Sequence, residues 1–263
     1  MQLSDNPEID ITVVVSCYNE QDLITGTLDN TIAALQESGR SFEIVVVDDK
    51  SKDNSVQVIR DYIRDHPSVR IILKANEVNR GLGNNYVEAA FVGHGKYYRL
   101  CCGDDGEPKE VLLNLFQHIG KADAIIPYNY KDVIGKSRMR VKLSKTFTAL
   151  VNFLSGYNIK YYNGLAIHLR YNILRWHPSS YGFGFQADIL TRLLDEGASY
   201  LQVPSYSIDR KGSASTALST RNCLSVAHTL LEVAIRRVRK ILYGRKGPQP
   251  IEVFLEPENQ ARS

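Results

Sequence analysis

The sequence lacks the features that mark several common classes of protein. No apolar run among the 263 residues approaches the ~20 residues that a membrane-spanning helix needs, so any membrane contact is expected to be peripheral. The first ten residues are polar and acidic, which predicts that a secretory signal is absent. The four cysteines include one adjacent pair, Cys101 and Cys102, but no CxxC spacing. Neither a zinc site nor thiol–disulfide chemistry is therefore expected, and a reducing compartment is favoured.

A strong charge imbalance and the common phosphate-binding motifs are also missing. The 32 basic and 29 acidic residues leave a net charge of +3, which is too small to indicate a nucleic-acid partner. There is no P-loop. The glycine-rich segment 79–85 has Tyr86 where a dinucleotide loop needs its third glycine, so a Rossmann cofactor site is not expected. Arg80 in this segment is still a candidate for binding a phosphate. The alternative is that the segment is only a surface turn.

Strands and helices alternate along the first half of the chain. With 43% hydrophobic and 23% charged residues, the composition is that of a globular protein. Short apolar runs predict buried strands at residues 11–15, 42–47, 69–73, 97–102 and 124–126, with helices between them. Beyond Pro127 the pattern becomes irregular, with helices near 144–154, 185–196 and 222–243 and a strand at 200–203. This alternation predicts an α/β fold with a mostly parallel sheet and helices on both faces.

Polar residues follow three of the expected strands. They occupy Ser16–Glu20, Asp48–Asp53 and Gly103–Glu107. Parallel sheets bind ligands where the carboxyl ends of their strands meet, so the three clusters predict one shared site. For any single cluster the alternative is a helix cap, but three such clusters on one sheet edge make that reading less favourable.

The segments 14–20 (VVSCYNE), 46–53 (VVDDKSKD), 79–81 (NRG) and 103–105 (GDD) follow one another in a distinctive order. Together they resemble the nucleotide-sugar signature of glycosyltransferase family 2. Residues 144–156 and 203–213 resemble the dolichyl- or polyprenyl-phosphate sugar transferase branch of that family. The resemblance implies a GT-A fold, with a nucleotide-sugar-binding half over residues 1–128 and an acceptor-binding half over 129–220. An amphipathic C-terminal helix and tail would then cover residues 221–263.

The resemblance also implies a set of ligand-binding residues. Those expected to bind the nucleotide sugar are Ser16, Tyr18, Glu20, Asp48, Asp49, Arg80 and Asp104. Asp104 matches the second acid of the family's Asp-x-Asp motif, which holds Mg²⁺ or Mn²⁺ on the diphosphate, and Asp105 is a second candidate ligand. Cys102 replaces the first acid of the motif. A thiol is a poor ligand for these hard cations, so metal binding by this chain departs from the family pattern.

Sugar transfer places specific demands on the remaining side chains. The departing nucleoside diphosphate gains negative charge, which Asp104 with its cation, Arg80 and Arg210 are expected to stabilise. A hydroxyl acceptor needs a general base, for which Asp188 is the candidate, although an exposed helix carboxylate is as plausible. A phosphate acceptor is already ionised and needs cations instead. The candidates are Arg138, Arg140, Lys145 and Arg210, with a solvated basic face as the alternative.

These observations favour a hexosyltransferase that moves a sugar from a UDP- or GDP-sugar to an acceptor, with a polyprenyl phosphate among the acceptors expected. The family resemblance implies that the transfer is inverting. One alternative is transfer to a saccharide hydroxyl during surface polysaccharide synthesis. Another is a nucleotide-sugar-binding protein that has lost turnover, which the replacement by Cys102 suggests. The C-terminal helix carries apolar residues beside Arg236, Arg237, Arg239 and Lys240. It is expected either to bind an anionic membrane or to pack on the domain. The expected location is the cytoplasm, including the cytoplasmic face of a membrane.

Overall fold

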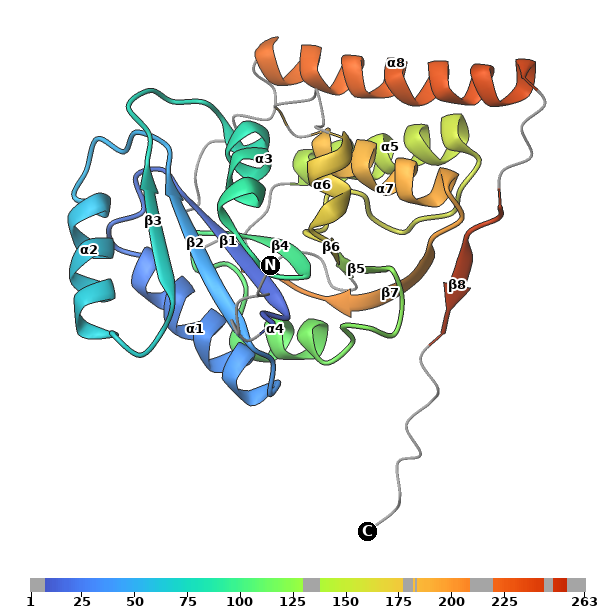
Figure 1. Ribbon diagram of the computed structural model, residues 1–263. Coiled ribbons are helices and arrows are strands. Elements are labelled where there is room, and N and C mark those ends of the chain that lie inside the picture. Colours follow the sequence, from blue (N-terminus) through green and yellow to red (C-terminus); the bar gives the residue numbers. More distant parts are fainter. Residues whose placement is uncertain are drawn as a thin grey trace, which may run out of the picture.

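The structure is a computed structural model that describes residues 8–129, 138–176, 182, 184–208, 220–243 and 248–254. Within the helices, the side chains of residues 138, 140 and 220–223 lie outside this description. One eight-stranded sheet runs through the molecule in the order β3-β2-β1-β4-β6-β5-β7-β8 (Figure 1). The sheet therefore continues across both halves that the sequence predicts.

The first four strands form the parallel half of the sheet. They are β1 (Ile11–Cys17), β2 (Phe42–Asp48), β3 (Ile71–Ala75) and β4 (Tyr97–Cys102). The helices that connect and follow them are α1 (Ile24–Glu37), α2 (Ser55–Asp65), α3 (Leu82–Val92) and α4 (Lys109–Phe116). β1 is a central strand that pairs with β2 and β4, and both of its faces are buried, which explains why its sequence does not alternate between apolar and polar residues.

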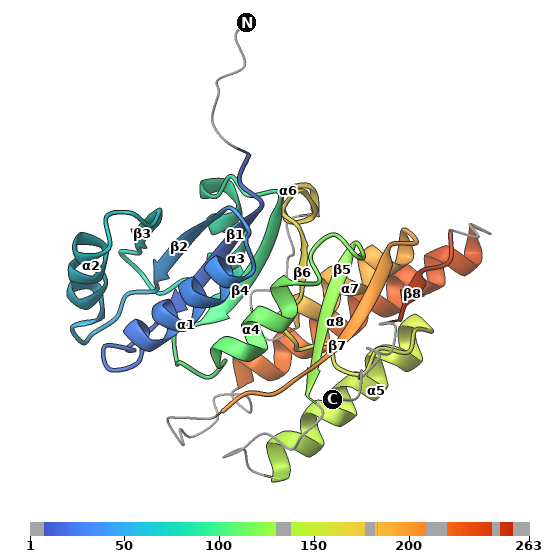
Figure 2. The same cartoon turned by 90° about the horizontal axis from the view of Figure 1, so that it is seen from below.

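Two apolar cores lie on opposite faces of the sheet. Val13 and Val15 of β1 point into the core made with α1, α2 and α4, whereas Val14 points into the core made with α3. Successive strand residues face opposite sides of a sheet, so one buried strand supplies both cores. The view in Figure 2 shows α1 and α4 on the same side of the sheet.

The second half of the chain completes the sheet and adds a further helical layer. Its strands are β5 (Ala124–Asn129), β6 (Ile167–Leu169), β7 (Ser199–Ser205) and β8 (Ile251–Val253). Its helices are α5 (Arg138–Ser155), α6 (Tyr171–Trp176), α7 (Phe185–Asp195) and α8 (Thr220–Leu242). β6 pairs antiparallel with β4 and β5. Helix α8 packs on α5 and α7, at the top of Figure 1.

The predicted fold class is confirmed, because the sheet is mostly parallel and helices cover both of its faces. The sequence did not reveal β6, α6 and β8, which span three, six and three residues and are too short for a clear period. The third strand begins at Ile71, two residues later than predicted. Among the described helices, none combines the length and the apolar character needed to cross a membrane.

Candidate functional site

The loops after β1, β2 and β4 are tied together at the carboxyl edge of the sheet. The backbone N–H of Asn19 donates to Ser51 Oγ at 2.9 Å, and Asn19 Oδ1 accepts from the N–H of Lys52 at 2.7 Å. The N–H of Gly103 donates to the carbonyl of Ser16 at 2.8 Å. In the described helices α1, α2 and α4, no N-cap side chain makes a capping hydrogen bond. The three polar clusters therefore adjoin, as the shared-site hypothesis requires.

Residues with a strained backbone conformation also lie at the carboxyl edge of the sheet. Positive φ angles occur at Asn19 (58°), Lys50 (67°) and Asp105 (51°), the non-glycine residues that show this conformation in the described part of the chain. Each lies in a loop that directly follows β1, β2 or β4. Left-handed backbone is unfavourable for residues with a Cβ atom, and it tends to persist at ligand-binding sites. The strain thus points to the same loops as the polar clusters.

Asp49 organises the loop that carries Arg80. Its carboxylate, only 6% exposed, accepts hydrogen bonds from the backbone N–H groups of Arg80 at 2.7 Å and Gly81 at 2.8 Å, and from Asn76 Nδ2 at 3.0 Å. Burial alone would raise the pKa of Asp49. The hydrogen bonds from this loop and from Asn85 outweigh burial and lower that pKa, because they favour the charged form. The structure thus shows Asp49 shaping a neighbouring loop, and its predicted contact with a nucleobase stays a prediction.

We expect Asp49→Ala to weaken nucleotide binding by about 1.5–3 kcal/mol, the usual effect of losing a hydrogen bond to a charged group. Calorimetric titration with UDP and GDP measures this change in affinity, with Asp61→Ala on the exposed side of α2 as the control.

The lowered pKa of Asp49 also makes the stability of the folded protein depend on pH. The stability supplied by the carboxylate is present above the pKa of an unfolded aspartate and is lost as the pH falls through the folded pKa. The melting temperatures of wild type and variant should therefore converge in acid. Equal dissociation constants at neutral pH would remove Asp49 from the nucleotide site.

The side chain of Arg80 is held at the start of α3. It is 45% exposed, and its Nη1 pairs with Glu88, which also pairs with Lys74. A guanidinium group has five N–H donors, so this pair leaves others that could reach a phosphate. The predicted phosphate contact remains open to test, and Glu88 is a partner that the sequence analysis missed. The only sequence signal for this ion pair was the position of Glu88 in the predicted helix, eight residues after Arg80.

The other residues predicted to bind the nucleotide surround the joined loops. Tyr18 is exposed, Ser16 and Glu20 are half-buried, and Asp48 is buried at the end of β2. The N–H of Glu20 donates to Ser55 Oγ at 2.9 Å. The structure brings these side chains to one edge of the sheet, while their individual roles stay predictions.

The two adjacent acids after β4 point to different surroundings. Asp105 Oδ1 accepts from Asn30 Nδ2 of α1 at 2.8 Å, and the Asp105 N–H donates to Thr27 Oγ1 at 2.9 Å. Asp104 is half-buried, and its Oδ1 accepts from the Gly106 N–H at 3.2 Å. Asp105 therefore contacts α1 in this structure, and its predicted role as a second metal ligand stays a prediction.

The protein groups near this loop fit a divalent cation only with help from the substrate. Burial, followed by the nearby charge of Asp104, raises the pKa of the Cys102 thiol well above its usual value, so the thiol stays protonated at neutral pH. Within the described residues, no group of three or more histidines, cysteines and acids could enclose a metal ion. Mg²⁺ is commonly held by one or two carboxylates together with substrate phosphates. Asp104 supplies the one carboxylate that such a site requires.

A buried ion pair fixes the far end of the same loop. Arg99 of β4 is fully buried, and its Nη2 lies 2.5 Å from Glu107 Oε1 while its Nη1 lies 2.7 Å from Cys101 Sγ. Glu107 comes three residues after Asp104, so the pair restrains the segment that carries the candidate metal ligand. The sequence analysis did not predict this ion pair, because Arg99 lies within an otherwise apolar run.

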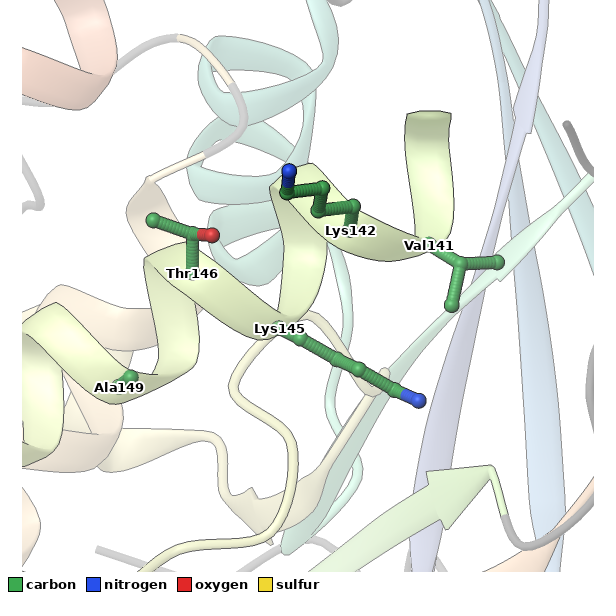
Figure 3. A pocket seen from close by; sticks show the side chains of 5 residues that line it. All are labelled: Val141, Lys142, Lys145, Thr146 and Ala149. Atoms are coloured by element: carbon green, nitrogen blue, oxygen red, sulfur yellow. The ribbon is translucent and has the colours of Figure 1, made fainter. Parts of the chain in front are cut away.

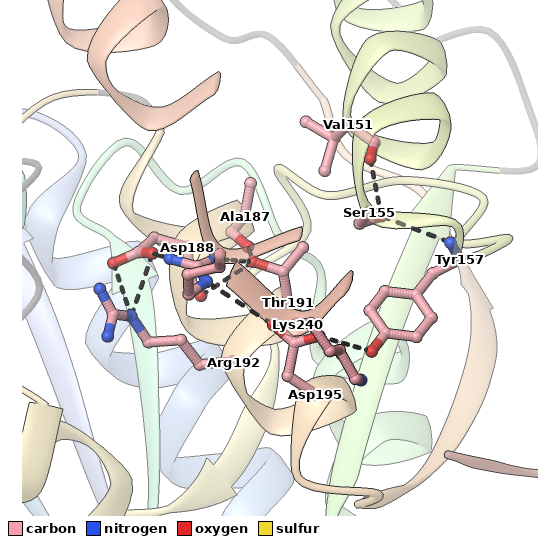
Figure 4. A network of polar contacts seen from close by, with 10 residues as sticks. Val151, Ser155, Tyr157, Ala187, Asp188, Thr191, Arg192, Asp195 and Lys240 are labelled. Atoms are coloured by element: carbon pink, nitrogen blue, oxygen red, sulfur yellow. Dashed lines mark hydrogen bonds and ion pairs between the residues drawn. The ribbon is translucent and has the colours of Figure 1, made fainter. Parts of the chain in front are cut away.

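Asp188 lies in a buried ion-pair network between α7 and α8. It is 2% exposed, and its carboxylate contacts Arg192 Nε at 3.1 Å and Arg236 Nη1 at 2.5 Å. Arg236 also approaches Asp195 at 3.6 Å, and Lys240 lies 3.4 Å from the same acid. Figure 4 shows this network. A general base must be able to reach its acceptor, and here two guanidinium groups occupy Asp188, so its predicted role as the base gains no support from the contacts.

One of the predicted acceptor residues lines a pocket on α5. The pocket has a volume of about 480 Å³ and is lined by Val141, Lys142, Lys145, Thr146 and Ala149 (Figure 3). Lys142 was not predicted, although its spacing of three residues from Lys145 places both on one side of a helix. The side chains of Arg138 and Arg140, and all of Arg210, lie outside the described residues.

Comparison with known proteins agrees with this geometry. A family model described as Glycosyl transferase family 2 matches residues 12–176. A dolichyl-phosphate beta-glucosyltransferase of Dictyostelium discoideum is 35% identical over 99 residues, which cover 36% of this chain and 30% of that protein. An undecaprenyl-phosphate 4-deoxy-4-formamido-L-arabinose transferase of Edwardsiella ictaluri is 37% identical over 86 residues, covering 33% of this chain and 26% of that protein. The chain thus spans about a third or less of the length of these relatives.

A solved structure shares the fold over most of the chain. Glucosyl-3-phosphoglycerate synthase from Mycobacterium tuberculosis, in complex with Mn²⁺, uridine diphosphate and phosphoglyceric acid, superimposes with a TM-score of 0.66 at 15% identity. The match covers 86% of this chain and 78% of that one. The fold is therefore GT-A, and the chain belongs to glycosyl transferase family 2.

Proposed function

We propose that the protein is a glycosyltransferase that moves a sugar from a UDP- or GDP-sugar to a polyprenyl phosphate, with inversion at the anomeric carbon. One observation carries the proposal. The family match over residues 12–176 includes all four nucleotide-sugar segments, and the structure joins the loops after β1, β2 and β4 at one edge of the sheet.

The described side chains fit the charge changes of this reaction. The bond between the anomeric carbon and the diphosphate breaks, and the leaving diphosphate gains negative charge that Arg80 would stabilise. A divalent cation at Asp104 would neutralise part of the same charge. The acceptor phosphate is itself the nucleophile and carries no proton that must be removed. Lys142 and Lys145 supply positive charge at the α5 pocket, where we place that acceptor.

We further propose that the reaction takes place in the cytoplasm. The three cysteines whose side chains the structure describes, Cys17, Cys101 and Cys102, are free thiols, as is usual in a reducing compartment. Burial, the largest influence, raises the pKa of Cys17 to about 11 and that of Cys101 to about 12, so neither thiol is ionised at neutral pH.

The direct test supplies the protein with a UDP- or GDP-sugar, undecaprenyl phosphate and Mn²⁺. We expect nucleoside diphosphate and glycosylated lipid to appear in equal amounts. Transfer only to a saccharide hydroxyl would instead identify a polysaccharide-building enzyme. Nucleotide-sugar binding without turnover on any acceptor would identify a binding protein.

Asp188→Asn separates a phosphate acceptor from a hydroxyl acceptor. If the acceptor is a phosphate, the turnover of folded protein should fall by less than about tenfold, because no base is needed. A hydroxyl acceptor should lose about 10²–10⁴-fold with its base. Asp195→Asn is the matched control, since it disturbs the same ion-pair network. A much larger loss for Asp188→Asn than for Asp195→Asn would assign Asp188 to the chemistry.

A further inference from the structure

The outward side of α8 is apolar. Five of its side chains recur at spacings of three, four and seven residues, and each is between 48% and 75% exposed. They are Leu224, Leu231, Ile235, Val238 and Leu242. On the opposite side of the helix, Thr229 and Val233 are buried against the domain. The helix therefore has one apolar side that packs inward and a second that meets solvent.

The adjoining helix α5 also exposes apolar side chains. Met139, Leu143, Leu150 and Phe153 are exposed, Phe153 to 84%, and they also recur at helical spacing. Helices α5 and α8 pack directly on one another. We call these nine exposed side chains of α5 and α8 the outer face. Monomeric proteins seldom expose contiguous apolar surface without a partner for it.

Charge is distributed unevenly between these two helices and the rest of the chain. Together α5 and α8 contain nine basic residues and one acid, Glu232. The remaining sequence contains 23 basic and 28 acidic residues. Lys142, Lys145, Arg237 and Arg239 are exposed on these helices. The outer face is thus apolar with positive charge beside it, whereas the rest of the protein is net negative.

The structure decides between the two expectations for the basic residues of α8. Arg236 and Lys240 turn inward to Asp188 and Asp195, as expected of a helix that packs on the domain, and they are not available as surface charges. Val226 and Leu230 also pack inward, so the predicted stripe divides between two sides of the helix. The exposed apolar side chains are consequently the main candidates for contact, and Arg237 and Arg239 remain at the surface.

We propose that the outer face docks the protein on an anionic lipid bilayer. Apolar side chains of a surface helix can enter the boundary between headgroups and acyl chains, while neighbouring basic residues attract anionic lipids. A second copy of the chain fits less well, because a two-fold interface would bring the same positive surfaces together. The proposal is independent of the catalytic one, although docking would bring α5 and its pocket close to a lipid-linked acceptor.

Vesicle flotation tests the proposal with the full chain and without any sugar nucleotide. The protein should float with vesicles made of equal parts phosphatidylglycerol and phosphatidylcholine, and much less with phosphatidylcholine alone. High salt should weaken the binding to anionic vesicles, because the basic residues act through screened charge. The variant Arg237→Gln/Arg239→Gln should bind more weakly and lose part of this salt dependence.

The apolar contribution is tested by Phe153→Ser/Leu231→Ser/Val238→Ser. We expect the ratio of bound to unbound protein to fall at least tenfold. The control, Ile251→Ser/Phe254→Ser, removes two apolar side chains that are as exposed but lie outside the outer face, and it should bind like wild type. Unchanged melting temperatures would show that both variants fold.

Three results would overturn the proposal. The first is wild-type protein that stays unbound with both kinds of vesicle. The second is an outer-face variant that floats as well as wild type. The third comes from size-exclusion chromatography. A wild-type dimer that the outer-face variant converts to a monomer would show that the face joins two copies of the chain.

Discussion

Asp104→Asn should lower the rate of sugar transfer by at least about a thousandfold, equivalent to roughly 4 kcal/mol of transition-state stabilisation. We propose Asp104 as the carboxylate that holds a cation on the diphosphate, and asparagine keeps its shape while removing the charge. The thiol of Cys102, whose pKa desolvation raises well above its usual value, is a poor ligand for such a hard cation. The measurement is release of nucleoside diphosphate in the presence of acceptor, over a range of Mn²⁺ concentrations.

The adjacent acid provides the control for this experiment. Asp105 contacts Asn30 and Thr27 of α1, so Asp105→Asn should keep most of the activity and chiefly affect the packing of α1. If both variants are equally inactive and need more Mn²⁺, then both acids are ligands, as the resemblance suggested. Full activity in Asp104→Asn would remove Asp104 from the mechanism.

Arg236→Ala should be the most destabilising of the substitutions considered for α8, at about 3 kcal/mol. It removes a cation 2.5 Å from Asp188, whose carboxylate is 2% exposed, and breaking a buried pair leaves an incompletely compensated charge. It also removes the hydrogen bond from Arg236 to Thr191. Thermal or urea unfolding measures the change, which should appear as a drop of several degrees in melting temperature.

Arg239→Ala is the matched control, because Arg239 lies on the same helix but is exposed. Surface substitutions of this kind usually change stability by no more than about 0.5 kcal/mol. Similar melting temperatures for the two variants would mean that the ion pair to Asp188 contributes little. Asp188→Asn in the Arg236→Ala background should recover part of the loss, since it removes the stranded charge.

The sequence predicted the parallel half of the sheet well because each signal there is local. β4 spans the predicted residues 97–102, and the polar segments after β1, β2 and β4 meet at one edge as expected. The direction in which each side chain points was harder to predict from the sequence. Asp104 and Asp105 are adjacent in sequence, yet only the folded backbone, with a φ of 51° at Asp105, turns the second carboxylate toward α1.

Contacts between distant segments were the part that could not be predicted. Arg236 is 48 residues away from Asp188, and no local pattern links them. The helical period of α8 indicated an amphipathic helix, but it did not distinguish a side that packs on α5 and α7 from one that meets solvent. Tertiary packing decided that Val226 and Leu230 lie inside while Val238 and Leu242 lie outside.

The ion pairs between α7 and α8 also limit how the chain can be shortened. Asp188 and Asp195 belong to the domain, whereas Arg236 and Lys240 arrive with the last described helix. A protein cut before residue 220 would lose both of these cations, along with the Thr229 side chain that packs against Gly184. Helix α8 is therefore a structural component of the sugar-transfer domain, and a minimal version of that domain must retain it through Lys240.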